Sequence, residues 1–343
     1  MQRTRASDGH NSNAAFQALK MNRSRYLTPE YYSAKRRTSS TRTKALLALA
    51  WVSIIWGTTW VASRAGVMHM PALEMSGIRQ TIAGFLFIVY FTALKHQWPR
   101  GPQWRVILVS SILNFILSNG LSTWGVKYIS GGLGSIISAI FPLWLVIILM
   151  FRGRTLPLAA LFGILLGFGG VCIIFYEHLH DFNNPDFKFG ICLSLIATVT
   201  WAFGTLYIKK QANNFNPYFS VGFQMAISGI TLFSVSMISG TAIPFAHIPA
   251  ISWWSIAYLV IFGSITTFAF YIYSLRHLPA ALASVYAYIN PVVAVLLGSV
   301  ILNEKLTWFL GFGAAITLTG VYLVNNSLKE KPSDQSSVVE PVM

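Results

Sequence analysis

The chain has 343 residues, of which 54% are hydrophobic and only 10% are charged. A soluble domain carries about 25% charged residues, so this composition argues against an ordinary water-soluble protein and favours an integral membrane protein. The net charge of +15 comes mainly from the N-terminus, because residues 1–44 hold ten Lys and Arg but only two acids. This segment lacks apolar periodicity, so we expect a disordered basic cytoplasmic tail and no nucleic-acid partner.

The first apolar run starts near residue 45. It is too long, and too far from the N-terminus, for a cleavable signal peptide, and it lacks a small-residue cleavage site. The Arg-rich and Ser-rich leader before it also resembles an organelle transit peptide. That reading stays open as an alternative to a cytoplasmic tail, as does a chain that starts at Met21.

The rest of the chain is a series of apolar runs near the length that crosses a bilayer, about 20 residues. Backbone groups in lipid must bond internally, so these runs must be helices or barrel strands. They lack two-residue alternation, which favours helices. We therefore expect an all-α integral membrane protein with ten transmembrane helices. The expected spans are 45–65, 74–94, 104–124, 131–151, 156–176, 189–208, 216–238, 252–274, 280–302 and 306–326.

The positions of Lys and Arg predict the orientation of these spans. If the N-terminus is inside, the inner connections hold eight Lys and Arg and the outer connections four, with twelve more in the two tails. Such an excess marks the cytoplasmic side. We expect a multi-pass protein of the cell (inner or plasma) membrane. Both termini should be cytoplasmic, including a disordered tail over residues 327–343.

An internal repeat divides the spans into two groups of five. The segment SGIRQTIAG (76–84) matches VGFQMAISG (221–229) at an offset of 145 residues, and the offset later becomes 149 and then 150. Because five is odd, the second half enters the membrane from the opposite side, as in many secondary transporters. The halves are expected at 45–176 and 189–326. Matched pairs include Trp56 and Trp201, Gly77 and Gly222, Gly84 and Gly229, and Pro142 and Pro291.

Four segments carry a resemblance to a known family. The sequences WGTTW (56–60), IRQTIAG (78–84), SIISAIFPLW (135–144) and ILNEKLTWFLGFGAAITLTGVYL (301–323) resemble the EamA family of the drug/metabolite transporter superfamily. This resemblance implies ten helices, inverted halves, a central substrate cavity and export of small metabolites, amino acids or toxic compounds. The family often has an acidic residue after the fourth span of each half. Here Glu304 fits, but the first half has Arg152-Gly153-Arg154 instead.

Several kinds of chemistry find no support in the sequence. The spans hold no paired carboxylates, so acid–base catalysis is unsupported, and we expect neither an enzyme nor a cofactor. The segment EHLHD (177–181) offers His178 and His180, but a solvated loop is preferred to a metal site there. Cys172 and Cys192 are expected to be free buried thiols, with a disulfide as the alternative.

Arg79 is the one charge well inside a predicted span, and an intramembrane charge is a functional candidate by default. The alternatives are a structural contact, snorkelling to the interface, or pairing with Glu74. Glu74 lies five residues away and points about 140° from Arg79 on an ideal helix, so a pair within the helix is poor. The repeat partner of Arg79 is the neutral Gln224.

Three further residues are candidates for a structural or gating role. Glu304 lies in the NEKLT turn (303–307), where a capping role is preferred to proton coupling. Pro142 and Pro291 each remove a backbone donor within a span. Loosened helices at corresponding positions of two halves point to a transport site.

Polar residues near the midplane should face one another or a wet cavity, because an unpartnered buried polar group costs about 1–3 kcal/mol. Trp56 and Trp201 are expected to face each other across a pocket that is aromatic and nearly uncharged. Packing through seams of small residues is the alternative for part of this set. The expected substrate-binding residues are Trp56, Thr59, Arg79, Asn114, Ser118, Ser138, Trp201, Thr205, Tyr288 and Asn290.

These observations favour a secondary transporter. It would move small metabolites, such as amino acids or amphipathic compounds, by alternating access, with an ion such as H+ as a coupling candidate. The resemblance to the EamA family implies that the direction is export. Its partners would be the small-molecule substrate and the lipid bilayer. Two other classes stay open. One is a membrane-embedded enzyme acting on a lipid or isoprenoid, which the lack of carboxylate and histidine clusters disfavours. The other is a membrane receptor that does not transport.

Overall fold

The computed structural model describes residues 29–151, 153, 157–210, 215–278 and 285–327. Regular structure in these residues is entirely helical, and nine helical stretches among them are long and apolar enough to cross a membrane. Large apolar side chains cover the outside of the bundle. Trp308, for example, is 92% exposed and Ile238 87%. Such a surface suits lipid rather than water. The predicted fold class, an all-α integral membrane protein, is confirmed.

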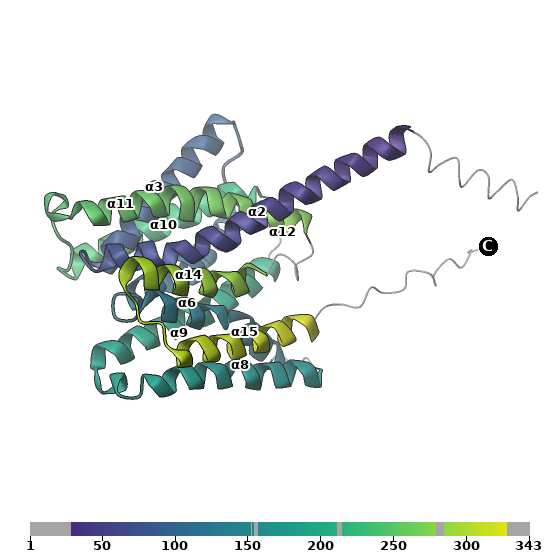
Figure 1. The fold of residues 1–343 in the computed structure, drawn as a ribbon. Coiled ribbons are helices and arrows are strands. Elements are labelled where there is room, and N and C mark those ends of the chain that lie inside the picture. The colour runs from purple at the N-terminus through teal and green to yellow at the C-terminus, as the bar shows by residue number, and fades with distance from the viewer. Residues whose placement is uncertain (1–28, 152, 154–156, 211–214, 279–284, 328–343) are drawn as a thin grey trace, which may run out of the picture.

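The helices lie side by side in one bundle (Figure 1). Several predicted spans consist of two or three shorter helices that follow one another almost without a break. In chain order the elements are α2 (Pro29–Val67), α3 (Ala72–Ala93), α4 (Pro102–Ser110), η1 (Ser111–Gly120), α5 (Leu121–Gly125), α6 (Gly131–Ala139), α7 (Phe141–Phe151), α8 (Leu158–Glu177), η2 (Asp181–Asn183), α9 (Pro185–Lys210), α10 (Pro217–Ile238), η3 (Phe245–His247), α11 (Ala250–Tyr258), η4 (Leu259–Thr266), α12 (Thr267–His277), α14 (Tyr286–Leu302) and α15 (Trp308–Ser327).

Nine of the ten predicted spans coincide with the nine membrane-length stretches. The remaining span, expected at 280–302, contains α14, an apolar helix of 17 residues that begins at Tyr286. Residues 280–284 lie outside the described part of the chain. The count of ten spans and the inverted repeat therefore stay predictions.

The N-terminal segment differs from its prediction where the structure describes it. Helix α2 begins at Pro29 and runs for 39 residues, so residues 29–44 are helical rather than disordered. Extending an existing helix costs little once a membrane span has nucleated it, and Lys, Arg and Ala in this segment permit it. The first part of α2 projects beyond the bundle (Figure 1). Residues 1–28 and 328–343, the other tail segments, lie outside the described residues.

The most extensive helix packing joins helices that the repeat relates. Helices α3 and α10 both have 22 residues, begin 145 positions apart and pack along their length. Helices α8 and α15 both have 20 residues, begin 150 positions apart and also pack together. Glycines allow the close approach, since a Cβ at Gly84 would collide with the backbone of Ala226. This pairing is the pattern expected if the two halves surround a common axis.

The third predicted span of each half contains a π-helical segment, η1 in one and η4 in the other. Such wider turns are frequent at functional sites. The fourth span of the first half is interrupted at Ile140, between α6 and α7 and just before Pro142. In the second half, α14 continues through Pro291. Corresponding prolines therefore have different local effects in the two halves.

The two cysteines depart in part from their prediction. Cys172 and Cys192 are both free, as expected, but both are exposed rather than buried. Each points away from the helix packing of the bundle, onto the apolar surface. A small apolar side chain such as cysteine is compatible with lipid, so burial within protein is not required.

Candidate functional site

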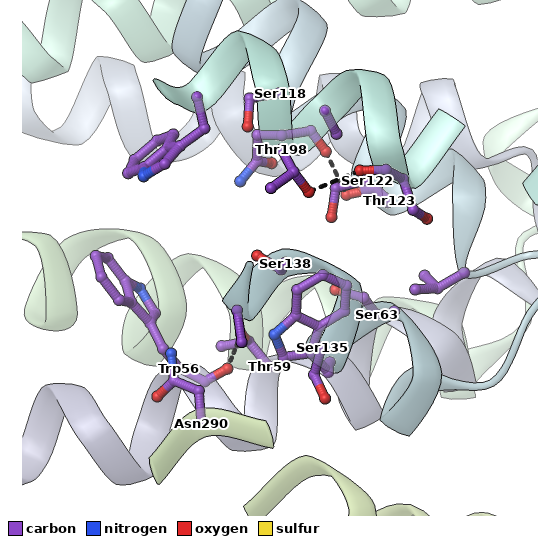
Figure 2. Close-up of a pocket in the computed structure, with 18 of the residues that line it drawn as sticks. Trp56, Thr59, Ser63, Ser118, Ser122, Thr123, Ser135, Ser138, Thr198 and Asn290 are labelled. Carbon is purple, nitrogen blue, oxygen red and sulfur yellow. Dashed lines mark hydrogen bonds between the residues drawn. The ribbon is translucent and has the colours of Figure 1, made fainter. Parts of the chain in front are cut away.

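A cavity of about 150 Å³ lies at the centre of the described bundle. Helices from both predicted halves contribute to its walls, which come from α2, α3, α6 and the η1–α5 region of the first half and from α9, η4, α12 and α14 of the second. In Figure 2, Ser118, Ser122, Thr123 and Thr198 form one side of the cavity. The side chains on the opposite side are those of Trp56, Thr59, Ser63, Ser135, Ser138 and Asn290.

Trp56 is held firmly in the cavity wall. Its indole Nε1 donates a hydrogen bond to the Gly263 carbonyl, at 3.2 Å, within the π-helical segment η4. Its ring packs against Phe268, Tyr271 and Tyr286, with centroid distances of 5.0–5.2 Å. The indole N–H is the only hydrogen-bond donor of a Trp side chain, and here it bonds to the protein. Trp56 therefore presents an apolar aromatic surface to the cavity. Trp201 also lines the cavity.

Arg79 is the one residue with a charged side chain among the described residues that line the cavity. It is only 6% exposed, and its Nη2 donates to Asn119 Oδ1 at 2.7 Å. Its Nε is buried without a hydrogen-bond partner in the described structure. Glu74, considered above as a partner, instead accepts a hydrogen bond from the Ile243 backbone N–H at 3.1 Å. Arg79 thus lies beside the cavity as a cation held by an amide rather than by a carboxylate.

Many serine and threonine residues line the cavity, and several donate their hydroxyl proton to the preceding turn of their own helix. Thr59 donates to the Trp56 carbonyl at 2.6 Å, and Thr198 to the Ser194 carbonyl at 2.8 Å. Thr123 and Ser135 make similar bonds to their own helices. A hydroxyl has one proton and two lone pairs, so these oxygens keep acceptor capacity.

Seven of the ten predicted substrate-binding residues line this cavity: Trp56, Thr59, Arg79, Ser118, Ser138, Trp201 and Asn290. Pro291 lines it as well, whereas Pro142 and Glu304 are not among its lining residues. The expectation that Trp56 and Trp201 share one pocket agrees with this geometry. Their contact with a substrate stays a prediction.

The other three predicted residues, Asn114, Thr205 and Tyr288, do not line the cavity. Asn114 is buried where η1 meets α9, so close that a Cβ on Gly204 would overlap its amide. Thr205 donates to the Trp201 carbonyl at 2.8 Å within α9. Tyr288 donates to the Val321 carbonyl and accepts from Asn325, which places its hydroxyl between α14 and α15. Of the three, only Tyr288 makes a side-chain hydrogen bond to another helix, and Asn114 Oδ1 is buried without a hydrogen-bond partner in the described structure.

Sequence reasoning missed a larger group of lining residues. These include Trp60, Ser63, Asn119, Ser122, Thr123, Ser135, Ser194, Thr198 and Phe268. Helical spacing could have found some of them. Thr59 and Ser63, Ser118 and Ser122, and Ser194 and Thr198 are pairs four residues apart, which share a helix face. A stripe of hydroxyls at this spacing is the signal that was available.

Glu304 joins the two halves at one end of the bundle. Helix α14 ends at Leu302, and Asn303 then takes a left-handed conformation (φ 54°), with the Glu304 N–H donating to the Gly298 carbonyl. This turn aims the carboxylate at the N-terminus of α6. There it accepts hydrogen bonds from the backbone N–H groups of Gly131 and Gly132, at 2.7 and 3.1 Å. A carboxylate at a helix N-terminus is favoured by these bonds and by the helix dipole.

Three more charged side chains make contacts at this same end. Arg64 of α2 donates from Nη1 to the carbonyls of Val126 and Lys127, at 2.6 and 2.5 Å. Glu74 accepts from Ile243, as described, and Glu177 accepts from the Thr307 hydroxyl at 2.5 Å. Glu74 and Glu304 each bond to the other predicted half, and Glu177, directly after the first half, bonds to the second. We call the region formed by Arg64, Glu74, Glu177 and Glu304 the carboxylate end.

The opposite end of the bundle is held by rings. Phe91 of α3 stacks with Tyr218 and Phe219 of α10, with centroids 6.2 and 5.7 Å apart. Trp98 and Trp104 each pack edge-on against Phe223 at 5.2 Å. We call Phe91, Trp98, Trp104, Tyr218, Phe219 and Phe223 the aromatic end. Its contacts also cross between the predicted halves, but they are apolar and weakly directional.

The histidine-containing loop shows no metal-binding geometry among the described residues. His178 Nδ1 lies 2.6 Å from Asp181 Oδ2, and both side chains are partly exposed. No group of three or more His, Cys, Asp or Glu side chains in the described residues is arranged to hold a metal ion. The pair is compatible with the solvated loop expected from the sequence.

The sequence of the chain is similar to those of known proteins over most of its length. The model of the EamA-like transporter family matches residues 43–176 and again residues 188–326. These two matches cover most of the chain. The chain belongs to the EamA-like transporter family. It is therefore a multi-pass membrane protein of a transporter family, and the predicted resemblance is confirmed.

Individual members of the family are similar over most of their length. The uncharacterized transporter YvbV of Bacillus subtilis is 29% identical over 296 residues, which cover 84% of this chain and 93% of YvbV. The uncharacterized inner membrane transporter YedA of Escherichia coli K12 is 31% identical over 288 residues, 80% of this chain and 91% of YedA. The chloroplastic WAT1-related protein At3g02690 of Arabidopsis thaliana is 26% identical, over 81% of this chain and 69% of that protein.

A solved crystal structure has a fold similar to that of this chain. It matches with a TM-score of 0.60 and 18% sequence identity, over 84% of this chain and all of that one. At this level of identity the match concerns the fold alone. The family assignment therefore rests on the sequence. The arrangement of the helices in this chain agrees with that of a solved structure.

Proposed function

We propose that this protein is a secondary transporter that exports small metabolites, such as amino acids or amphipathic compounds, by alternating access. The observation that carries the proposal is the central cavity, to which helices from both halves of the sequence contribute. Rocking of the two five-helix halves would open it to one side of the membrane at a time. The substrate would contact Trp56, Thr59, Arg79, Ser118, Ser138, Trp201 and Asn290.

In this mechanism the carboxylate end is the closed side of the structure. In the cavity wall toward this end, α6 packs closely against α2 and against the segment that follows α5: a Cβ on Gly134 would lie 3.0 Å from the Trp60 ring and 2.9 Å from Val126. Glu304 holds the N-terminus of the same helix α6. Opening this side requires those contacts to separate. Glu304 therefore has a gating role, and Pro291 and the break near Pro142 provide points where the fourth helices deform.

The Lys and Arg distribution supports cytoplasmic termini in the inner or plasma membrane, which makes the carboxylate end the outer one. Export then begins with the cavity facing inward. Energy would come from an ion gradient, for which H+ is the candidate. Thiol labelling of intact cells at single cysteines near Arg276 and near Lys305 tests the orientation. Labelling from outside near Arg276 would contradict it.

Counterflow in liposomes tests the function directly. The purified full-length protein is reconstituted, loaded with one unlabelled compound from a panel of amino acids and small amphipathic compounds, and diluted into the labelled compound. Transient uptake above that of protein-free liposomes supports transport. No exchange with any member of a broad panel, by protein shown to be folded by its thermal transition, would contradict it and favour a receptor.

A further inference from the structure

We infer that Arg79 and Asn119 form a subsite for the carboxylate group of the transported compound. The inference rests on the proposed function and narrows it to small organic carboxylates that bring their own hydrogen-bond donors. Three observations carry it: the unmet hydrogen-bonding capacity of Arg79, the way the surrounding polar side chains hold it, and the acceptor character of the rest of the cavity.

The guanidinium of Arg79 has more donors than the protein uses. It carries five N–H groups, and the described structure gives it one hydrogen bond, to Asn119, while Nε is buried and unpartnered. A buried cation needs an opposite charge or several hydrogen bonds to offset the loss of water. Because Arg79 lines the cavity, a ligand can supply both. A carboxylate fits a guanidinium particularly well, through two parallel N–H···O bonds.

Among the residues that the structure describes, no carboxylate bonds to Arg79. Between residues 40 and 327 the sequence has five acidic residues, Glu74, Glu177, Asp181, Asp186 and Glu304. Glu74 is nearest along the chain but bonds to Ile243, and Glu177 and Glu304 bond at the carboxylate end. The acidic residues of the described bundle therefore leave the position beside Arg79 free for an anionic ligand.

A chain of neutral hydrogen bonds orients the guanidinium. Asn119 Oδ1 accepts from Arg79 and also from Gln80 Nε2, at 2.7 and 3.3 Å. Gln80 in turn donates to Ser76 and accepts from Ser228 of α10. These amides and hydroxyls fix the geometry without neutralising the charge. A site preorganised in this way loses less free energy when a ligand binds.

The remaining cavity wall favours hydrogen-bond donors on the ligand. Thr59, Thr123, Ser135 and Thr198 donate their own protons to backbone carbonyls, so their oxygens are available chiefly as acceptors. An ammonium or hydroxyl group on the ligand can bond to these oxygens. The aromatic surface of Trp56 accepts an apolar body. The complete ligand is therefore a carboxylate with a nearby donor group.

The test uses compounds that differ only in the groups under question. One set is phenylalanine, phenylalaninamide, phenethylamine and 3-phenylpropionate, and a second set has the corresponding leucine compounds. For the leucine set, binding is measured as quenching of the protein's tryptophan fluorescence. For the phenylalanine set, binding is measured as a shift of the protein's thermal transition. Counterflow of each compound is measured in liposomes. The carboxylates with a donor group should bind best, and the amides and amines should bind about 30-fold more weakly or worse.

Three variants separate ligand binding from structural support. Arg79→Gln should lose the preference for carboxylates. Arg79→Lys keeps the positive charge but loses the planar guanidinium that can form two parallel hydrogen bonds to a carboxylate. It should therefore retain only part of the preference for carboxylates. Asn119→Asp places a permanent carboxylate against Arg79, so it should leave the thermal transition unchanged or higher and yet suppress carboxylate binding. Arg105→Gln, which removes an exposed cation, is the matched control and should behave as the wild-type protein.

Two results would overturn the inference while leaving the transporter intact. One is counterflow of neutral or cationic members that equals that of the carboxylates. The other is full carboxylate transport by Asn119→Asp or by Arg79→Gln. Failure of the proposed function looks different, because folded wild-type protein would then exchange no compound of either set or of the wider panel.

Discussion

The two ends of the helix bundle hold the predicted halves together by different kinds of contact. At the carboxylate end, Glu74, Glu177 and Glu304 accept directed hydrogen bonds from the opposite half. At the aromatic end, rings from α3 and α10 stack with centroids 5.7–6.2 Å apart. A directed bond to a charged group is lost when its partners separate by about an ångström, whereas stacked rings keep part of their contact while they slide. We therefore expect the carboxylate end to close in one defined geometry and the aromatic end to adjust its contacts while the halves move.

The largest expected effect comes from Glu304→Ala. Two buried N–H groups at the start of α6 lose their acceptor, which should destabilise the closed carboxylate end by about 2–3 kcal/mol. Labelling of a Ser63→Cys thiol in a background without Cys172 and Cys192 should rise about tenfold or more. The control variant is Lys305→Ala, at the exposed residue next to Glu304. Equal labelling of the two variants would mean that Glu304 does not close this end.

A smaller effect is expected for Arg64→Ala. Arg64 bonds to two carbonyls at the end of α5, but it is partly exposed, so water can replace some of the lost bonds. We expect a loss of about 1 kcal/mol and a several-fold rise in Ser63→Cys labelling. Arg64→Lys should recover part of it. If Ser63→Cys labelling rose more in Arg64→Ala than in Glu304→Ala, the contact of Arg64 with the end of α5 would be the main closing contact.

Phe91→Leu tests the aromatic end. It removes the two ring contacts with α10 and three more with Phe87, Tyr90 and His96, while keeping an apolar side chain. Stability should fall by about 0.5–1.5 kcal/mol, measured as a lower thermal transition. Labelling of the Ser63→Cys thiol should stay unchanged, because the carboxylate end is intact. An increase in that labelling would show that the two ends are coupled and do not differ in the way described above.

The smallest effect should follow Glu177→Gln. An amide carbonyl can still accept the hydrogen bond from Thr307, so only the charge is lost. We expect less than about 1 kcal/mol in the thermal transition. Glu177→Ala, which removes the acceptor, should cost more. Equal losses in the two variants would assign the effect to charge rather than to the hydrogen bond.

The fold was largely predictable because hydropathy and the lipid solvent constrain it strongly. Apolar runs of spanning length gave the helices, and the offset between Trp56 and Trp201 placed both at one cavity. The π-helical segments η1 and η4 were not predictable, since no feature of residue spacing distinguishes them from α-helix. The helical start of residues 29–44 was also missed, because polar composition masked a helix that continues from the membrane span.

The site could be predicted only where the signal is local. Arg79 stands out in an apolar span, and lines the cavity. Asn114 and Tyr288 are polar residues in similar spans, but their side chains contact a neighbouring helix instead of the cavity. Residue type alone does not reveal such neighbours. The turn around Glu304 was recognised, but its partners Gly131 and Gly132 lie more than 170 positions away in the sequence. That contact depends on how whole helices pack.

The length of α2 has a mechanical consequence. One uninterrupted helix connects Trp56 and Thr59 at the cavity with Pro29, far outside the bundle. About 40 Å of helix separates Trp56 from that end, so a tilt of 10° at the cavity displaces it by about 7 Å. Helix α2 is thus a lever that magnifies small movements at the cavity. A reporter group attached near its start would register them at a distance.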